Sequence, residues 1–263
     1  MTVPYLPPVD RLLKLGAEPA RRRTWPDYRN LRLEPRHVPA LIRMATDPAL
    51  HAAEERDPAG WAPVHAWRSL AQLGADEAAE PLLAMLAREI EHPWVVEEVP
   101  AVLGMIGGAA LHGATLLLFD EERDEEVRLA AAAVIANVAH EHPDRRDEAA
   151  AILVKQLEDW PHQGRLLNAY LVADLVGLGE TAAAPLMEAA FAAHAVDLTV
   201  GGDWEDMQVE LGLIPERITP PPPETVMALH REGSVRPPTN AEAKARARRK
   251  AEKAARKRNR KKK

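Results

Sequence analysis

The chain has 263 residues, of which 46% are hydrophobic and only 4% aromatic, and it contains no cysteine. The absence of cysteine excludes disulfides, thiolate nucleophiles and cysteine-based zinc sites. The formal net charge of −6 combines two opposite parts. Residues 242–263 contain 13 Lys or Arg and 2 Glu, a net charge of +11, which leaves −17 for residues 1–241.

The sequence does not predict a membrane protein. The N-terminal residues do not combine a basic start with an apolar stretch, so no secretory signal is expected. The longest apolar run, Leu129 to Ala136, is far shorter than the roughly 20 residues that cross a bilayer. The sequence therefore predicts a cytoplasmic protein without a membrane span.

Residues 1–33 predict an irregular N-terminal cap, because Pro4, Pro7 and Pro8 interrupt regular structure. From Glu34 onwards, apolar residues recur every three or four positions, in segments that end at Gly, Pro or Asp. This pattern is typical of amphipathic helices. The predicted helices are 35–46, 61–73, 77–90, 94–106, 109–119, 125–140, 144–158, 165–178, 180–194 and 204–211.

These helices repeat in pairs. Three second helices share an opening in which Pro39, Pro81 and Pro185 are each followed by two apolar residues. Proline is tolerated in a first turn because its missing N–H would have had no partner there. Two-helix units with a period of about 20–50 residues indicate a solenoid.

One stretch carries a family resemblance. The residues from Leu116 to Asp120, followed by Asp124-Glu-Glu-Val-Arg128 and Ala130-Ala131, resemble the HEAT repeat, and the likeness extends over about 36–194. In that family the equivalent Asp and Arg pair along the stack, and the alanines seat the helix crossing. The unit at 61–90 departs from the pattern, because it lacks the Asp and Val-Arg element. The chain also resembles bacterial HEAT-like proteins with Lys-rich C-termini.

The resemblance implies an all-α fold, a right-handed α-solenoid of HEAT-like helical hairpins with a disordered basic C-terminal tail. The expected parts are the cap at 1–33, the solenoid with a capping helix at 34–214, a Pro-rich linker at 215–241 and the tail at 242–263. Stacked pairs bury a continuous core. We expect inside it Val64, Trp67, Leu70, Leu73, Leu82, Leu86, Val99, Leu103, Ile106, Val127, Ala131, Val134, Ile152, Leu157, Leu171, Leu175 and Leu178.

The tail has no apolar residue larger than alanine, so it cannot pack a core. One interpretation is polyanion binding, because each Lys or Arg that meets a phosphate releases counterions. The other is a solubilising segment, or one that folds back on the acidic body. The candidate polyanion-binding residues are Lys244, Arg246, Arg248, Arg249, Lys250, Lys253, Arg256, Lys257, Arg258, Arg260, Lys261, Lys262 and Lys263.

Three side chains share one stripe of the predicted helix 61–73. Trp61, His65 and Arg68 follow four- and three-residue spacing, so they face the same way. Trp and Arg are enriched at binding hot spots, so this stripe is a candidate protein contact. The competing interpretation is packing between neighbouring repeats.

Other polar groups have structural explanations. His140-Glu141-His142 lacks metal-site spacing and stands at a helix end, where His can meet terminal carbonyls. Asp203 is placed to cap the last helix, within the acidic group that also contains Glu205, Asp206 and Glu210. Asp174 lies near the core face and is expected to bond a neighbouring helix or backbone.

This organisation favours a non-enzymatic protein-binding scaffold, since an elongated acidic surface suits basic protein segments. A first alternative is an RNA- or ribosome-associated factor anchored by the tail. A second is a bilin lyase-like or other HEAT-fold enzyme, such as an alkylpurine DNA glycosylase, although an acidic body opposes DNA binding. No cofactor, metal or catalytic residue is predicted. The resemblance places the candidate protein-binding residues of the second helices on the concave side: Glu77, Glu80, Arg88, Lys155 and Glu188.

Overall fold

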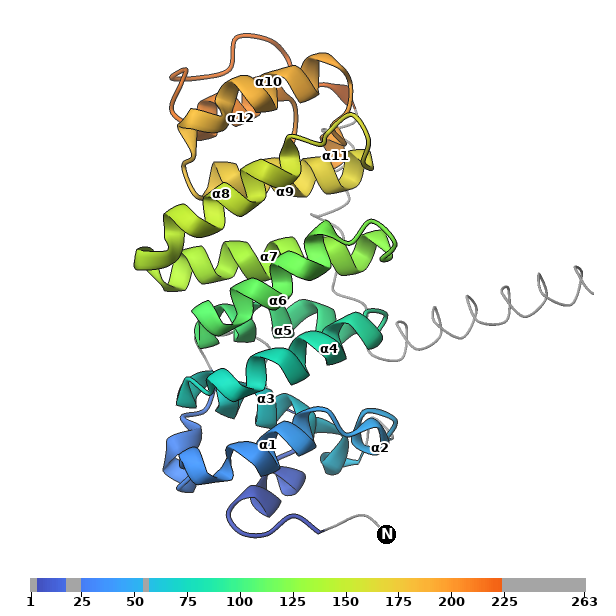
Figure 1. The fold of residues 1–263 in the computed structure, drawn as a ribbon, viewed down its shortest axis with the longest axis vertical. Coiled ribbons are helices and arrows are strands. Elements are labelled where there is room, and N and C mark those ends of the chain that lie inside the picture. Colours follow the sequence, from blue (N-terminus) through green and yellow to red (C-terminus); the bar gives the residue numbers. More distant parts are fainter. Residues whose placement is uncertain (1–3, 18–24, 54–56, 224–263) are drawn as a thin grey trace, which may run out of the picture.

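A computed structural model describes residues 4–17, 25–53 and 57–223, and every regular element in these ranges is a helix (Figure 1). The all-α prediction is therefore confirmed for the described chain. The predicted basic tail and most of the predicted Pro-rich linker lie outside these residues. The α-helices are α1 Val38–Ala45, α2 Pro48–His51, α3 Ala62–Leu73, α4 Ala79–Arg88, α5 Pro93–Ile106, α6 Gly108–Phe119, α7 Glu125–Glu141, α8 Arg146–Leu157, α9 Arg165–Gly177, α10 Ala184–Ala192, α11 Leu198–Gly201 and α12 Trp204–Glu210.

Each predicted helix has a counterpart, and the differences concentrate at helix starts. A 3₁₀ turn precedes the α-helix at Pro35–His37, Asp76–Ala78 and Thr181–Ala183, where the periodicity predicted one continuous helix. Such turns are common at helix N-termini, because their tighter bonds satisfy some of the first N–H groups. The short helices α2 and α11 were not predicted, since four residues carry no periodic signal.

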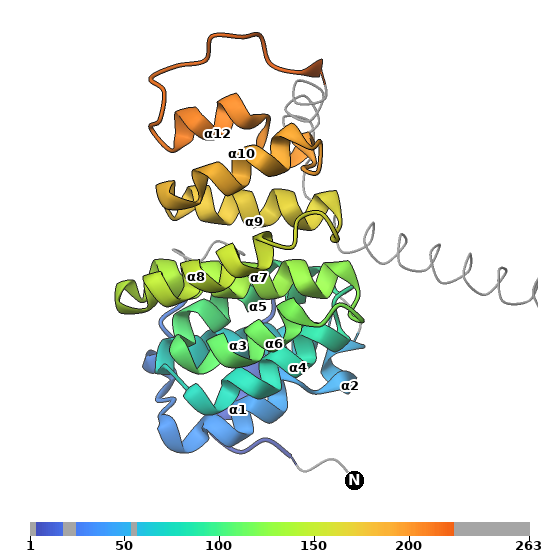
Figure 2. The same cartoon turned by 45° about the horizontal axis from the view of Figure 1, so that its top comes forward.

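The helices follow one another along the long axis of the molecule, from α1 at one end to α12 at the other (Figure 1). Their contacts divide the stack into two layers. The first layer contains α3, α5, α7 and α9, each packed on the next, and the second contains α1, α4, α6 and α8. Figure 2 shows the same order after a rotation, with α9, α10 and α12 stacked beyond α7 and α8.

Most of the core is one cluster that extends from Val9 near the N-terminus to Met207 in α12, and a small second cluster contains Ala169, Ala190 and Val196. The predicted core residues are buried with two exceptions, Leu73 and Ile152, which are only partly buried. Leu73 is the last residue of α3, beside the turn at Gly74. In α8 the fully buried face passes through Leu153 and Leu157, so Ile152 lies at its edge.

Two helices of the first layer approach each other closely at Gly104 of α5. A Cβ added there would lie 2.4 Å from the Cβ of Asn137 and 2.9 Å from its carbonyl carbon in α7. Backbone atoms of a packed helix cannot move aside cheaply, so the absent side chain sets the spacing of α5 and α7.

Gly104→Ala is therefore expected to lower the free energy of unfolding by about 1–3 kcal/mol, as overpacked cores do. Gly177→Ala is the matched control, because a Cβ there meets nothing within 4 Å. That variant should be neutral or up to ~1 kcal/mol more stable, since glycine is a poor helix former. Urea denaturation measures both, and equal stability of the two variants would contradict the close packing.

Candidate protein-binding groove

The aromatic-cationic stripe of α3 is mostly internal. His65 and Arg68 are 0% exposed, so the prediction that they contact a partner is wrong and the packing interpretation holds for both. They are covered because the N-terminal cap and α5 pack over this side of α3. Trp61 is partly buried, and its ring meets that of Trp94 edge-on at 5.0 Å between centroids.

Arg68 belongs to a buried polar group that joins α3 to α5. Its guanidinium Nε donates to Glu98 Oε2 at 2.9 Å, and its second contact is an ion pair with Glu98 Oε1. The indole N–H of Trp67 donates to the same carboxylate at 3.0 Å. Burial by itself lowers the pKa of Arg68, but the hydrogen bond and charge of Glu98 outweigh it and raise the pKa.

His65 joins the N-terminal cap to the same helix. Its Nε2 lies 2.8 Å from the Gly16 carbonyl oxygen, and its Nδ1 lies 2.7 Å from the Tyr28 hydroxyl. A carbonyl only accepts, so Nε2 carries the proton and Nδ1 accepts from Tyr28. The stripe thus fastens residues 16 and 28 to α3.

Glu98→Leu is expected to cost about 3–5 kcal/mol of unfolding free energy, because it leaves the Arg68 charge buried without a counterion. The double variant Arg68→Met with Glu98→Leu should recover most of that loss, since no charge then remains inside. Glu158→Ala breaks an exposed pair with Lys155 and should cost at most about 1 kcal/mol. Urea denaturation of the three variants checks this order, which a double variant as unstable as Glu98→Leu would contradict.

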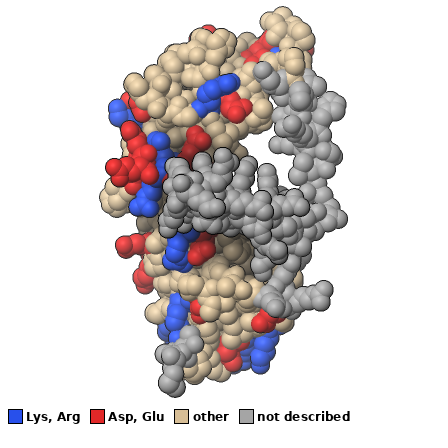
Figure 3. Space-filling view, turned by 90° about the vertical axis from the view of Figure 1, so that its right-hand side faces the viewer, with Lys and Arg blue, Asp and Glu red and all other residues tan. Residues whose placement is uncertain are grey.

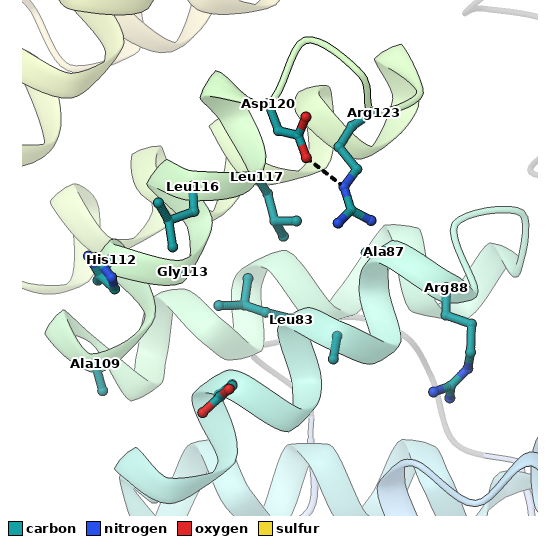
Figure 4. Close-up of a pocket in the computed structure, with 12 residues that line it drawn as sticks. Leu83, Ala87, Arg88, Ala109, His112, Gly113, Leu116, Leu117, Asp120 and Arg123 are labelled. Carbon is teal, nitrogen blue, oxygen red and sulfur yellow. Dashed lines mark hydrogen bonds and ion pairs between the residues drawn. The ribbon is translucent and has the colours of Figure 1, made fainter.

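A groove lies between α4 and α6 in the second layer, and it encloses ≈ 740 Å³. Figure 4 shows Leu83 of α4 and Leu117 of α6 facing each other across it, with Arg123 reaching down from the loop after α6. Its lining residues follow helical spacing on both helices. They are Glu80, Leu83, Ala84, Ala87, Arg88, Ala109, His112, Gly113, Leu116, Leu117, Asp120 and Arg123.

Small residues leave this space open. Ala84 and Ala87 on α4 face Ala109 and Gly113 on α6, and none of them fills the gap between the helix axes. A Cβ on Gly113 would lie 2.6 Å from Leu83 Cδ1, so the glycine makes room for that leucine in the floor. Leu116 stands above the floor with 61% of its surface exposed. The groove therefore offers apolar surface to a ligand.

Some of the charged side chains around the groove have ion-pair partners, and one does not. Arg123 Nε contacts Asp120 Oδ2 at 2.9 Å, and Arg88 Nε contacts Glu89 Oε1 at 3.0 Å. The hydrogen bond from Arg123 holds the pKa of the Asp120 carboxyl below its usual value. Glu80 is exposed and has no ion-pair partner among the described residues.

The structure brings together only some of the predicted second-helix residues. Glu80 and Arg88 line the groove, and Glu77 is exposed one turn before Glu80. Lys155 lines a smaller hollow of ≈ 410 Å³ with Phe119, on the other side of the α6 C-terminus. Glu188 is exposed on α10, away from both.

Leu116 was missed by the sequence analysis. The signal was present in the run Leu116-Leu117-Leu118, since three consecutive helical positions cannot all face one core.

The Asp–Arg pairing that the HEAT resemblance implies does not form here. Arg128 Nε donates to the Leu118 carbonyl oxygen at 2.8 Å, while Asp120 is bonded to Arg123. Arg128 thus satisfies a carbonyl at the C-terminal end of α6, which fixes α7 to the helix before it. Asp120 instead bonds within the loop after α6, to Arg123 and to the Glu122 N–H.

The acidic group around α12 is engaged by an arginine from the following loop. Asp203 caps the helix as predicted, accepting from the Asp206 N–H at 3.1 Å. Arg217 donates to both Asp203 carboxylate oxygens, at 2.7 and 2.9 Å, and pairs with Asp206 and with Glu205. These contacts lower the pKa of Asp203, chiefly through the Arg217 hydrogen bonds. The predicted boundary at 214 thus falls inside a segment that stays attached to α12.

No group of three or more His, Asp or Glu side chains suited to a metal ion occurs in the described ranges. His142 Nε2 lies 3.3 Å from the Met105 carbonyl oxygen, in line with its predicted role at a helix end.

Asp174 of α9 differs from expectation. Its carboxylate has no hydrogen-bond partner within the described part of the chain, although we predicted a bond to a neighbouring helix or backbone. Burial raises the pKa of Asp174 to about 7, because the charged form loses hydration without compensation. Asp174 is half-buried on α9 and lines neither of the two hollows described above.

The pKa of Asp174 makes stability depend on pH. Because the folded-state pKa of about 7 lies above the ordinary value of 3.8, stability is highest at low pH, falls as pH rises between these two values and levels off above about 7. Asp174→Asn should therefore stabilise the protein at pH 8 by about 1–3 kcal/mol and much less at pH 4. Asp147→Asn, at a side chain that is 98% exposed, is the control. Thermal melts at both pH values test this, and a gain independent of pH would contradict it.

Comparison with known proteins adds no relative. No protein-family model matches the chain, no curated protein matches it significantly, and no solved structure does. Among the described residues, none of the helices combines the length and apolar character needed to cross a bilayer.

Proposed function

We propose that this chain is a non-enzymatic scaffold that binds a protein partner through its second helix layer. In this proposal the helix pairs form a right-handed solenoid of HEAT-like hairpins, and α4 and α6 supply the docking surface. The observation that carries it is the groove between these helices, which combines an apolar floor with the exposed Leu116 and a charged rim. Protein-binding sites share this arrangement of an apolar centre and a polar edge.

Charge supports the same proposal. Residues 1–241 carry a net −17, and such a body attracts basic segments and repels nucleic acid. On the face shown in Figure 3, acidic and basic side chains are interspersed along the left-hand side, so no large basic patch is visible there.

A second candidate is an RNA- or ribosome-associated factor, favoured by the 13 Lys or Arg of residues 242–263. It differs from the scaffold in where the binding energy arises. A polyanion would bind through the tail, with an affinity that falls steeply as salt rises.

Affinity purification from the native cell, with the full chain and a chain ending at Asn240 as parallel baits, separates the two. The scaffold predicts that the same protein partner is recovered by both baits and survives ribonuclease treatment. If every partner disappears with the tail or with ribonuclease, the scaffold is wrong and the tail-anchored factor is favoured.

A further inference from the structure

The groove has features that select one kind of occupant. We infer that it binds an amphipathic helix of a partner protein, with leucine-like side chains in the groove and Lys or Arg towards the start of α4. This inference rests on the proposed scaffold function and specifies the chemistry of its partner. It follows from the exposed Leu116, from carboxylates without ion-pair partners, and from the residues that other possible occupants of the groove would bring.

Leu116 is the exposed apolar side chain that an occupant of the groove would cover. Most leucines of the stack are buried, whereas Leu116 is 61% exposed directly beside the groove floor formed by Leu83 and Leu117. Covering such a side chain removes apolar surface from water and contributes about 1.5–3 kcal/mol when burial is complete. An occupant with bulky apolar side chains at helical spacing matches the rows of α4 and α6.

The charged side chains around the groove differ in whether they already have ion-pair partners. Arg88 and Arg123 are each held by a neighbouring carboxylate, so an acidic ligand would have to compete with Glu89 and Asp120. Asp76, Glu77 and Glu80 are exposed at the start of α4, and none of the three has an ion pair within the described chain. A basic side chain there gains attraction without displacing an existing partner.

Two occupants from this protein itself fit less well. The basic segment 242–263 satisfies the charge, but it has no apolar residue larger than alanine to cover Leu116. A second copy would bring residues with a net −17 against the same carboxylates. A partner that is both basic and leucine-rich on one face meets both requirements.

The test uses the full chain and a fluorescent synthetic peptide of about 14 residues, with leucines on one face of a helix and lysines on the other. Binding is followed by fluorescence anisotropy. Two comparison peptides share its charge without its leucines: the same peptide with alanine at each leucine, and residues 242–263 of this chain. We expect the leucine-containing peptide to bind about tenfold or more tightly than either.

Variants locate the binding. Leu116→Glu and Glu80→Lys change exposed side chains, so circular dichroism and melting should stay as in the native chain. Each should weaken peptide binding by about tenfold or more. Val96→Glu is the matched control, because Val96 is 42% exposed on α5 in the other layer, and it should leave affinity within about twofold.

Three outcomes overturn the inference: no binding by the native chain, equal binding by Leu116→Glu, or equal binding of either peptide that lacks leucine. Equal binding of residues 242–263 would assign the groove to the chain's own tail. The purification result is independent of these outcomes. A partner retained by both baits with no groove binding would leave the scaffold standing and reject only this site.

Discussion

In the described part of the chain, the helices bury their apolar faces against one another and against the N-terminal segment, and the fold depends on that packing. At the crossing of α5 and α7, Gly104 brings the two backbones into contact near Asn137. The alanine-rich α7 then contacts α5, α6, α8 and α9. Small residues at these crossings let the layers approach closely enough to exclude water from the main core cluster.

Small side chains also account for the groove. Between α4 and α6 the small residues do not meet backbone to backbone, so they leave a channel where the core is already complete. Leu116 has no position inside, because Leu117 and Leu118 occupy the inward directions of that turn. Leu116 thus adds exposed apolar surface beside the groove floor formed by Leu83 and Leu117.

Helix periodicity and proline placement predicted the longer helices, and most of the residues predicted to lie inside are buried, because both depend on local sequence. Arg68 shows where that reasoning stops. Its spacing with Trp61 and His65 indicated a shared stripe but not what covers it, and the covering groups Tyr28 and Glu98 come from distant segments. The groove had the same limit, since Glu80 and Arg88 were predicted on α4 while Leu116 comes from another helix. Net charge and helix positions follow from local sequence, whereas the burial and pairing of side chains depend on segments far apart in the chain.

The contacts of Arg217 with the acidic residues at the start of α12 bear on where the protein can be truncated. Composition places the end of the helical body at 214, yet the arginine that neutralises Asp203, Glu205 and Asp206 comes three residues later. A fragment cut at 214 would leave three carboxylates crowded at the start of α12, where like charges repel. Thr219 also bonds to Glu205, so a fragment meant to stand alone has its natural end beyond that residue.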